Sequence, residues 1–404
     1  MTKKISFVFI YLANFLFYKS LIKLSFFKTK KKHILFFPRH WHIGGTKKFT
    51  DSFLEFLVKS NYNITIVITK DEYYELLKTN YYINERIKFH IIDNDFIHHQ
   101  HYYPLSHSLF KYFKLDILKQ SMLLLKLQIK YKCKTVIVSA ANPTEMFTLF
   151  CLPAKILYFL HTLPWNTIDK GNKYILDKYL NKNKKIITVS NFAKQKIIEF
   201  WEIKENTNFV NYIYNFTESK KINHLIRIEE QIVITSIGYV TKDKNPLYFI
   251  NCAIKIIDNY KDKKIIFQWI GCGNMINECK DACKNYSNIK FVGFDENISK
   301  YLNESDVYFH PSFGESHGIS VIEAMSCGLP CIVTNYGGTI ESIVDGLNGF
   351  HINPNNINDG IEKLKILIEN RELRKKMGLE SEKRYNEMFT EEIWESEMSK
   401  IFKI

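Results

Sequence analysis

DVYFHPSFGESHGISVIEAMSCGLPCIVTNYGGTIESIVDGLNGF, residues 306–350, is the stretch that decides the fold. It predicts a strand at 307–310, an amphipathic helix at about 317–327, a strand at 330–334 and a short helix after Gly337-Gly338. The order strand, helix, strand, helix is typical of βαβ units. The stretch therefore predicts an α/β fold built on a parallel sheet.

Two carboxylates accompany the first predicted helix, Glu315 at its entry and Glu323 two turns further along. The backbone N–H groups between them fall in the unsatisfied first turn, whose partial positive charge suits a phosphate. These N–H groups belong to Ser316, His317, Gly318 and Ile319. The pattern indicates an extended anionic ligand with hydroxyl groups at each end. The alternatives are a helix cap for Glu315 and a solvated helix face for Glu323.

The same stretch resembles a known family. The residues that carry the resemblance are Pro311-Ser312, Glu315-x7-Glu323 followed by Ala324-Met325, Cys327-Gly328-Leu329-Pro330, and Gly337-Gly338-x-x-Glu341. They look like the signature of retaining GT-B glycosyltransferases of the family 4 type (glycosyl transferases group 1). The resemblance implies two Rossmann-like domains facing a cleft, with Glu323 on the ribose of a nucleotide-diphosphate sugar and Glu315 on its sugar. It implies no metal and no cofactor besides this co-substrate.

Three further segments match donor-binding positions of that family. Gly44-Gly45 follows the first predicted strand, where the family has a loop that touches the donor diphosphate; a tight turn is the alternative. His161 ends another strand and matches a histidine that contacts the donor sugar, although a core histidine would look the same. Gly238, Tyr239 and Lys244 lie in a segment that resembles the family's G-R-L-x-x-x-K. The resemblance makes Glu315, His161 and Lys244 the predicted catalytic residues.

The chain departs from the family at Tyr239, which replaces an arginine expected to neutralise the leaving diphosphate. Either activity is reduced or a neighbouring cation compensates. The candidate cations are Lys242, Lys47 and Arg39. A second departure is His317, where the family often has an apolar residue.

Composition limits the classes of protein. The 404 residues suffice for two domains, and 46% hydrophobic residues exclude disorder. The 56 basic and 42 acidic residues give a net charge of +14, which fits nucleic acid, an anionic membrane or phosphorylated substrates. Nucleic acid is disfavoured because only six of the basic residues are arginines, at 39, 86, 227, 371, 374 and 384, and no nucleic-acid motif is present. Eight scattered cysteines favour a reducing compartment, hence the cytoplasm.

The predicted domain order is a basic, apolar segment at 1–32, an acceptor domain at 33–215, a donor domain at 216–385 and a last helix at 386–404 that crosses back to the first domain. The first half is predicted to be a doubly wound parallel sheet. The strands predicted from apolar runs in the two domains are 33–38, 64–69, 87–93, 135–140, 156–161 and 186–190, then 232–237, 265–271 and 289–293.

Two other segments leave alternatives open. Residues 5–18 are apolar and flanked by lysines, but they are shorter than the roughly 20 residues of a membrane span. They fit an interfacial anchor, a packing helix, or a span or signal. The segment 93–107 holds Asp93-Asn94-Asp95 and four histidines, for which a polar surface loop is favoured over a metal site.

The sequence thus predicts a glycosyltransferase that moves a hexose, with retention, from a nucleotide-diphosphate donor to a glycan or lipid-linked acceptor. Cell-surface polysaccharide or lipopolysaccharide synthesis at the inner face of the cytoplasmic membrane fits the charge and the apolar start. The alternatives are a nucleotide-sugar-binding protein weakened by Tyr239 and a membrane-surface scaffold built on residues 1–32.

Overall fold

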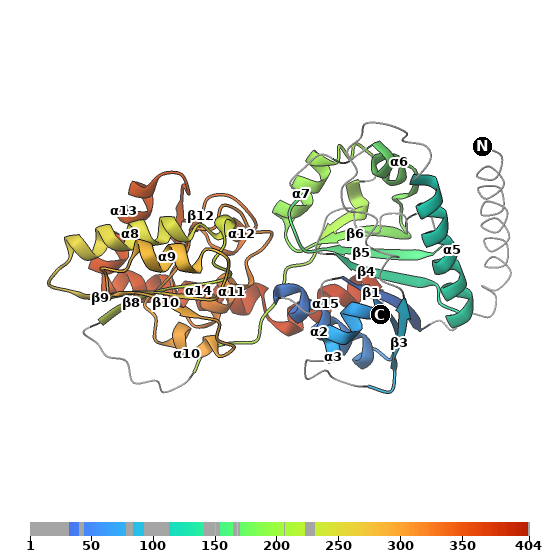
Figure 1. Cartoon of the computed structure of the whole chain (residues 1–404), viewed down its shortest axis with the longest axis horizontal. Helices are drawn as coiled ribbons and strands as arrows, with labels where there is room; N and C mark the ends of the chain where they lie inside the picture. The colour runs from blue at the N-terminus through green and yellow to red at the C-terminus, as the bar shows by residue number, and fades with distance from the viewer. Residues whose placement is uncertain are drawn as a thin grey trace. The chain divides into compact units, whose positions relative to one another are not determined.

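The computed structural model describes residues 32–39, 44–77, 84–92, 113–140, 150, 154–164, 168, 170–205, 207–222 and 231–402. Within these residues the chain forms two compact units (Figure 1). The first unit holds the residues up to 188 together with 194–212. The second holds residues 213–403 and the short segment 189–193.

The first unit contains a seven-stranded sheet in the order β3-β2-β1-β4-β5-β6-β7. All its paired strands run parallel. The strands are β1 (His33–Pro38), β2 (Asn63–Thr69), β3 (Ile87–Ile92), β4 (Thr135–Ala140), β5 (Lys155–Leu160), β6 (Lys184–Thr188) and β7 (Val210–Tyr212). Apolar runs such as HILFFP form these strands because a parallel sheet is buried on both faces. The prediction of a doubly wound sheet is confirmed, whereas β7 was not predicted.

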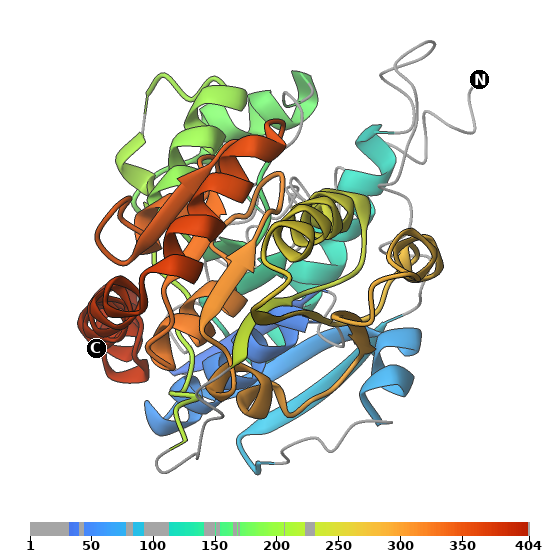
Figure 2. The ribbon, with the colours of Figure 1, turned by 90° about the vertical axis from the view of Figure 1, so that its left-hand side faces the viewer.

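Helices cover both faces of this sheet (Figures 1 and 2). The helices are α2 (Gly44–Lys59), α3 (Lys70–Leu77), α5 (Phe113–Tyr131), α6 (Lys170–Tyr179) and α7 (Asn191–Phe200), with a 3-10 turn η3 (Thr207–Phe209). Residues of α5, α6 and α7 share one core with the sheet. Helix α2 packs on the other face, where the Phe53 ring lies 5.5 Å from that of Phe36.

The second unit contains a six-stranded sheet in the order β10-β9-β8-β11-β12-β13, again with parallel pairs throughout. Its strands are β8 (Gln231–Ile237), β9 (Lys264–Ile270), β10 (Ile289–Gly293), β11 (Val307–His310), β12 (Cys331–Thr334) and β13 (Gly349–Ile352). β10 and β11 have the predicted bounds, while β13 was not predicted.

Side chains of the second sheet alternate between two cores. Val307 and Phe309 of β11 join one cluster, and Tyr308 joins the other. The first cluster is covered by α8 and α9 together with α13, and the second by α10 and α11. The helical segments are η4 (Lys242–Lys244), α8 (Pro246–Asn259), α9 (Ile276–Ala282), α10 (Ile298–Asn303), α11 (Ile319–Ser326), α12 (Thr339–Ser342), α13 (Ile357–Glu369), α14 (Arg371–Met388) and α15 (Glu391–Phe402).

The C-terminal region contains one helix that was not predicted. α14 was expected only as a polar segment, because most of its residues are charged and few are buried. It begins where the Asn370 side chain accepts a hydrogen bond from the Leu373 N–H group at 2.8 Å. α15 has the predicted bounds, and its Trp394 packs on Phe216 at 4.9 Å within the second unit. A contact of α15 with the first domain stays a prediction.

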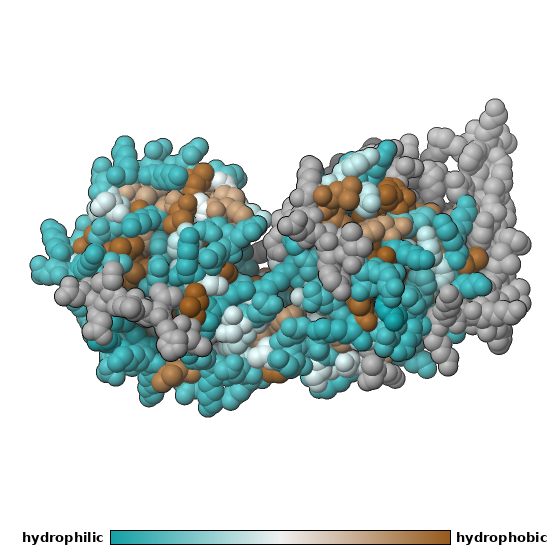
Figure 3. Space-filling model, turned by 90° about the horizontal axis from the view of Figure 1, so that it is seen from below, coloured by the Kyte–Doolittle hydropathy of each residue, from teal (hydrophilic) through white to brown (hydrophobic). Residues whose placement is uncertain are grey.

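The predicted N-terminal membrane segment and the 93–107 loop lie outside the described residues, apart from Lys32. Among the helices that are described, none combines the length and apolarity of a membrane span. On the face seen in Figure 3, the described surface is mostly hydrophilic, with apolar residues in small groups. Membrane attachment therefore stays a prediction about the first 32 residues.

Candidate active site

Two loops of the second unit bring predicted catalytic residues together. β8 and β11 are parallel neighbours, and the loops that follow them carry Lys244 and Glu315. The carboxyl ends of neighbouring parallel strands are where ligands bind in open α/β sheets. The topology therefore gathers these two side chains at one edge of the sheet.

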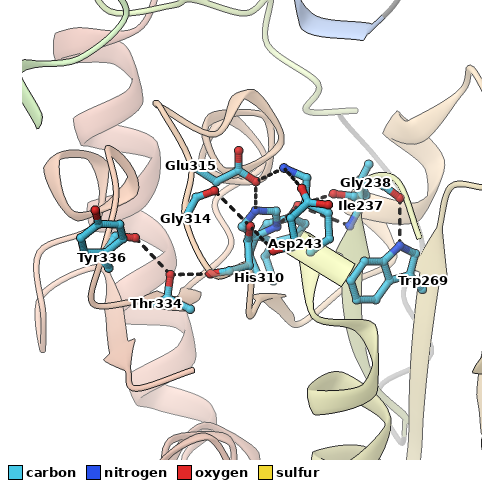
Figure 4. Close-up of polar contacts among 12 residues, drawn as sticks. Ile237, Gly238, Asp243, Trp269, His310, Gly314, Glu315, Thr334 and Tyr336 are labelled. Carbon is cyan, nitrogen blue, oxygen red and sulfur yellow. Dashed lines mark hydrogen bonds and ion pairs between the residues drawn. The ribbon is translucent and has the colours of Figure 1, made fainter. Parts of the chain in front are cut away.

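Backbone contacts hold the two loops against each other (Figure 4). The carbonyl oxygen of Asp243 accepts hydrogen bonds from the Phe313 N–H group at 2.9 Å and from the Ser312 hydroxyl at 3.1 Å. The indole N–H of Trp269 donates to the Gly238 carbonyl at 2.9 Å and fixes the start of the first loop. Lys244 follows directly after Asp243, so these contacts set its position opposite Glu315.

One oxygen of Glu315 receives two donors. The Nζ atom of Lys244 lies 2.5 Å from Oε1, and the Nε2 atom of His310 lies 2.8 Å from the same oxygen. No partner of Oε2 is found in the described part of the chain, and Figure 4 shows this oxygen pointing away from both donors. The arrangement leaves one carboxylate oxygen able to accept ligand hydroxyl groups.

The charges of this cluster support one another. Burial alone would raise the pKa of Glu315, but Lys244 and His310 hold it well below its ordinary value. Burial would likewise lower the pKa of Lys244, yet the Glu315 carboxylate outweighs it and the pKa is raised. Glu315 is therefore ionised and Lys244 protonated at neutral pH.

Gly337 and Gly338 belong to the site because they allow a close backbone approach. The Gly338 N–H group donates to the Glu315 carbonyl at 2.7 Å. A Cβ atom added to Gly338 would lie 2.1 Å from the Ser316 carbonyl oxygen, closer than any side chain tolerates. The glycine pair thus fixes the backbone of Glu315.

The sequence predicted Glu315 at the entry of a helix, but the residue lies in a loop. Helix α11 begins at Ile319, because its N-cap Gly318 has a φ of 83°, a left-handed conformation that interrupts a continuous helix. Glu323 lies inside α11 and is 8% exposed, so it is not on a solvated helix face. The prediction that both carboxylates accompany one helix is therefore wrong for Glu315.

Glu341, from the glycine motif, has a structural contact that the sequence did not suggest. Its carboxylate accepts the N–H groups of Asn191 and Phe192, and it accepts the Tyr214 hydroxyl at 2.7 Å. These N–H groups lack helical partners because they begin α7. The Ser190 hydroxyl accepts from the Ala193 N–H group at 3.0 Å, so Ser190 caps the start of α7.

His317 is fully buried, with 0% of its surface exposed. Its Nδ1 atom accepts from the Asn215 N–H group at 3.3 Å, and its ring stacks on Tyr214 at 5.1 Å. Burial lowers the pKa of His317 to about 3, although Glu315 opposes this, so the ring is neutral at neutral pH. Nε2 is buried and has no partner in the described part of the chain. Donor binding through this side chain stays a prediction.

The first unit holds Gly44, Gly45 and His161. Both glycines fall in the first turn of α2, which begins earlier than predicted, so their N–H groups precede the helical hydrogen bonds. Nε2 of His161 lies 2.9 Å from the Ser139 hydroxyl, and the ring lies 4.4 Å from that of Phe49 in α2. Burial lowers the pKa of His161 to about 4. These contacts suit a core histidine, while contact with a donor sugar stays a prediction.

Comparisons with known proteins bear on the family and the fold. The family model described as Glycosyl transferases group 1 matches residues 220–384. Residues 220–384 are a group 1 glycosyltransferase domain. With two parallel-sheet α/β units, the chain has the GT-B fold.

Two relatives and one solved structure show how far the likeness extends. The chain is 35% identical over 136 residues to the UDP-Gal:alpha-D-GlcNAc-diphosphoundecaprenol alpha-1,3-galactosyltransferase of Escherichia coli, which covers 33% of this chain and only 35% of that enzyme. It is 26% identical to an uncharacterized glycosyltransferase of Methanocaldococcus jannaschii over 92% of this chain and 98% of the relative. A crystal structure of a glycosyltransferase from Rickettsia africae is 20% identical, with a TM-score of 0.73 and coverage of 93% and 98%.

Tyr239 stands where the family resemblance leads us to expect an arginine. Tyr239 is 47% exposed in the loop that leads to Lys244. Two of the three candidate compensating cations are bound within the first unit, Arg39 to Glu72 and Lys47 to Asp51. Lys242 is exposed and forms no ion pair with the described residues. Lys242, three residues after Tyr239, is therefore the candidate without an ion pair among the described residues.

His310 is the site residue that sequence reasoning missed. It looks like the last residue of an apolar strand, and the residue is only 3% exposed. The available signal was its place at the carboxyl end of a parallel strand, five residues before Glu315. In the described part of the chain, no three His, Cys, Asp or Glu residues gather as metal ligands.

Proposed function

We propose that the protein transfers a hexose from a nucleotide-diphosphate sugar to a hydroxyl group of a glycan or lipid-linked acceptor, with retention at the anomeric carbon. The observation that carries this proposal is the Glu315 carboxylate, with Oε1 held by Lys244 and His310 and Oε2 without a partner among the described residues. A fixed carboxylate with one open oxygen suits the hydroxyl groups of a sugar, and an adjacent lysine suits a phosphate.

In the proposed reaction, the bond between the anomeric carbon and the diphosphate oxygen breaks while the acceptor oxygen attacks from the same face. The acceptor proton passes to the departing phosphate oxygen. Lys244 neutralises the charge that develops on the diphosphate, and Glu323 holds the ribose. Contributions from the N–H groups of Gly44 and Gly45 and from His161 rest on the family resemblance.

The name of the E. coli relative supports the choice of donor and acceptor. That enzyme's name specifies UDP-galactose and a sugar on diphosphoundecaprenol, a lipid carrier. That name favours a UDP-linked hexose as the first donor to test. A lipid-linked acceptor also fits the net charge of +14, since such acceptors carry phosphate at a membrane surface.

A thermal-shift screen with UDP, GDP, ADP and TDP sugars tests the donor, using the wild type and Glu323→Ala. A ligand at 100 times its dissociation constant adds about 2.7 kcal/mol of apparent stability. We expect one nucleotide to stabilise the wild type and not Glu323→Ala, with slow release of free sugar from the same donor. Stabilisation by none of them would overturn the proposal. Unchanged turnover after EDTA treatment is expected, because the proposed mechanism uses no metal.

A catalytically weakened binding protein is the second candidate, and Tyr239 is the observation that favours it. Such a protein would be stabilised by the same nucleotide sugar but would release no sugar from it. The donor-hydrolysis assay separates the two candidates, since a binder shows stabilisation without turnover.

A further inference from the structure

His310 lies between the buried core of the second unit and the Glu315 carboxylate. It is the last residue of β11, and its Nε2 atom lies 2.8 Å from Oε1 of Glu315. On its other side, Nδ1 lies 3.4 Å from the Tyr308 hydroxyl, and the two rings stack at 5.9 Å. The imidazole is thus held from both sides, and its side chain is 4% exposed.

The contacts determine where the proton of His310 lies. An ionised Glu315 only accepts hydrogen bonds, so Nε2 must carry a hydrogen toward it. Burial raises the pKa of Tyr308, so its hydroxyl keeps its proton at neutral pH and lies within reach of Nδ1. The Tyr308 hydroxyl is itself held at 3.3 Å by the Ile237 backbone at the end of β8. The orientation of the imidazole is therefore fixed by the sheet.

The charge of Lys244 has two partners, Glu315 and, in the proposed reaction, the departing diphosphate. Its Nζ atom pairs with Glu315 at 2.5 Å, and Asp243 lies 3.8 Å away. In the proposed reaction the same ammonium group also neutralises the departing diphosphate. When Lys244 turns toward the diphosphate, His310 is the remaining donor to Oε1 among the described residues.

We propose that His310 is a positioning residue that keeps Oε1 of Glu315 occupied, so that Oε2 stays directed at the donor sugar while Lys244 serves the diphosphate. This inference rests on the proposed function and names the part of it that selects the sugar. His310 acts through Glu315 and has no contact of its own with the sugar.

The test compares affinity for UDP with affinity for UDP-galactose, or the nucleotide and nucleotide sugar that the wild-type screen selects. His310→Phe keeps a flat ring on Tyr308 but removes the donor, whereas His310→Gln restores an N–H donor. His351→Phe is the matched control, because His351 lies in the same sheet and its Nε2 bonds to the Ile343 carbonyl at 2.9 Å.

We expect His310→Phe to bind UDP as the wild type does, to lose about tenfold in relative affinity for the sugar nucleotide, and to lose at least about tenfold in kcat. His310→Gln should recover most of both losses, and His351→Phe should show neither. Equal weakening of UDP and UDP-galactose, or no recovery in His310→Gln, would overturn the inference by showing a merely structural role. A wild type that binds no nucleotide sugar would instead overturn the proposed function.

Discussion

Each unit contains one ion pair between a glutamate and a cation at a carboxyl end of its sheet, and the two pairs differ in one respect. In the first unit, Arg39 lies 2.5 Å from Oε1 of Glu72, while Oε2 of Glu72 accepts the Thr69 N–H and hydroxyl groups, both at 2.9 Å. In the second unit, both donors to Glu315 share Oε1. The Glu72 pair is closed, and the Glu315 pair is open.

The difference separates a structural ion pair from one suited to a ligand. A closed pair satisfies both carboxylate oxygens within the unit and ties the end of β2 to the residue after β1. An open pair keeps the carboxylate charged and oriented but leaves hydrogen-bonding capacity for a guest molecule. Under the proposed function, the open pair serves sugar recognition and the closed Arg39–Glu72 pair serves stability alone.

The strongest way to test the comparison is to neutralise the open carboxylate. Glu315→Gln keeps the shape of the side chain but removes the charge that Lys244 and His310 orient. We expect kcat to fall by about 10²–10³, the range for losing one preorganised electrostatic contact. The melting temperature should fall as well, because Lys244 loses its nearest counter-charge. The measurement is steady-state donor hydrolysis, followed by transfer once the acceptor is known. Activity within a factor of about three of the wild type would place the sugar site elsewhere.

The matched change in the closed pair is Glu72→Gln. It removes the Glu72 charge from the Arg39 guanidinium, whose side chain is 9% exposed. Because the pair is not fully buried, we expect a loss of about 2–3 kcal/mol, somewhat below the cost of breaking a fully buried pair. Urea unfolding measures the loss, and kcat should stay near the wild-type value. A large fall in kcat without a loss of stability would contradict the division between the units.

The sequence predicted the sheets well because their strands are continuous apolar runs. HILFFP at β1 has the predicted bounds, since a strand buried on both faces leaves no choice of period. IKFVG at β10, an edge strand with alternating burial, also has the predicted bounds. α14 was missed for the opposite reason. It is polar around most of its circumference, and its start depends on the single Asn370 cap.

Within the site, the motif residues were predictable and their contacts were not. The Lys244–Glu315 pair joins residues 71 positions apart, and its geometry depends on the Asp243 carbonyl, which no side-chain pattern reveals. The positive φ of Gly318 moved Glu315 out of the helix. Glycine permits this conformation without requiring it, so the sequence alone could not fix the start of α11.

A smaller effect is expected from replacing Lys242, the cation three residues after Tyr239. If Lys242 compensates for the missing arginine, Lys242→Ala should lower kcat by about tenfold, and Tyr239→Arg should offset much of that loss in the double variant. The measurement is a double-mutant cycle on donor hydrolysis. Lys263→Ala, a lysine over the Tyr260 ring beyond α8, is the control for loss of one positive charge. Equal kcat in the wild type and Lys242→Ala would show that Lys242 does not compensate for the missing arginine.

The smallest effect uses two histidines with a lowered pKa, one in each unit. Burial lowers the pKa of His161 to about 4 and that of His317 to about 3, from an ordinary value of 6.5. Because each ring is neutral when folded and binds a proton when unfolded, each costs stability as the pH falls from about 6.5 toward its folded pKa. Protonation of Glu315 also destabilises the fold in acid. Because the pKa of Glu315 is lowered, that loss of stability occurs below pH 4.5, its ordinary pKa.

His161→Gln and His317→Gln should therefore each flatten the dependence of melting temperature on pH between about 6.5 and 4.5 by one proton. Differential scanning calorimetry across this range measures it. If the two units unfold in separate transitions, each variant should change only the transition of its own unit, because the two histidines share no contact within the described residues. An unchanged slope in His317→Gln would show that its ring already binds a proton when folded. A protonated ring could not accept the Asn215 N–H group at Nδ1, so that outcome would also contradict the hydrogen bond that holds the ring in place.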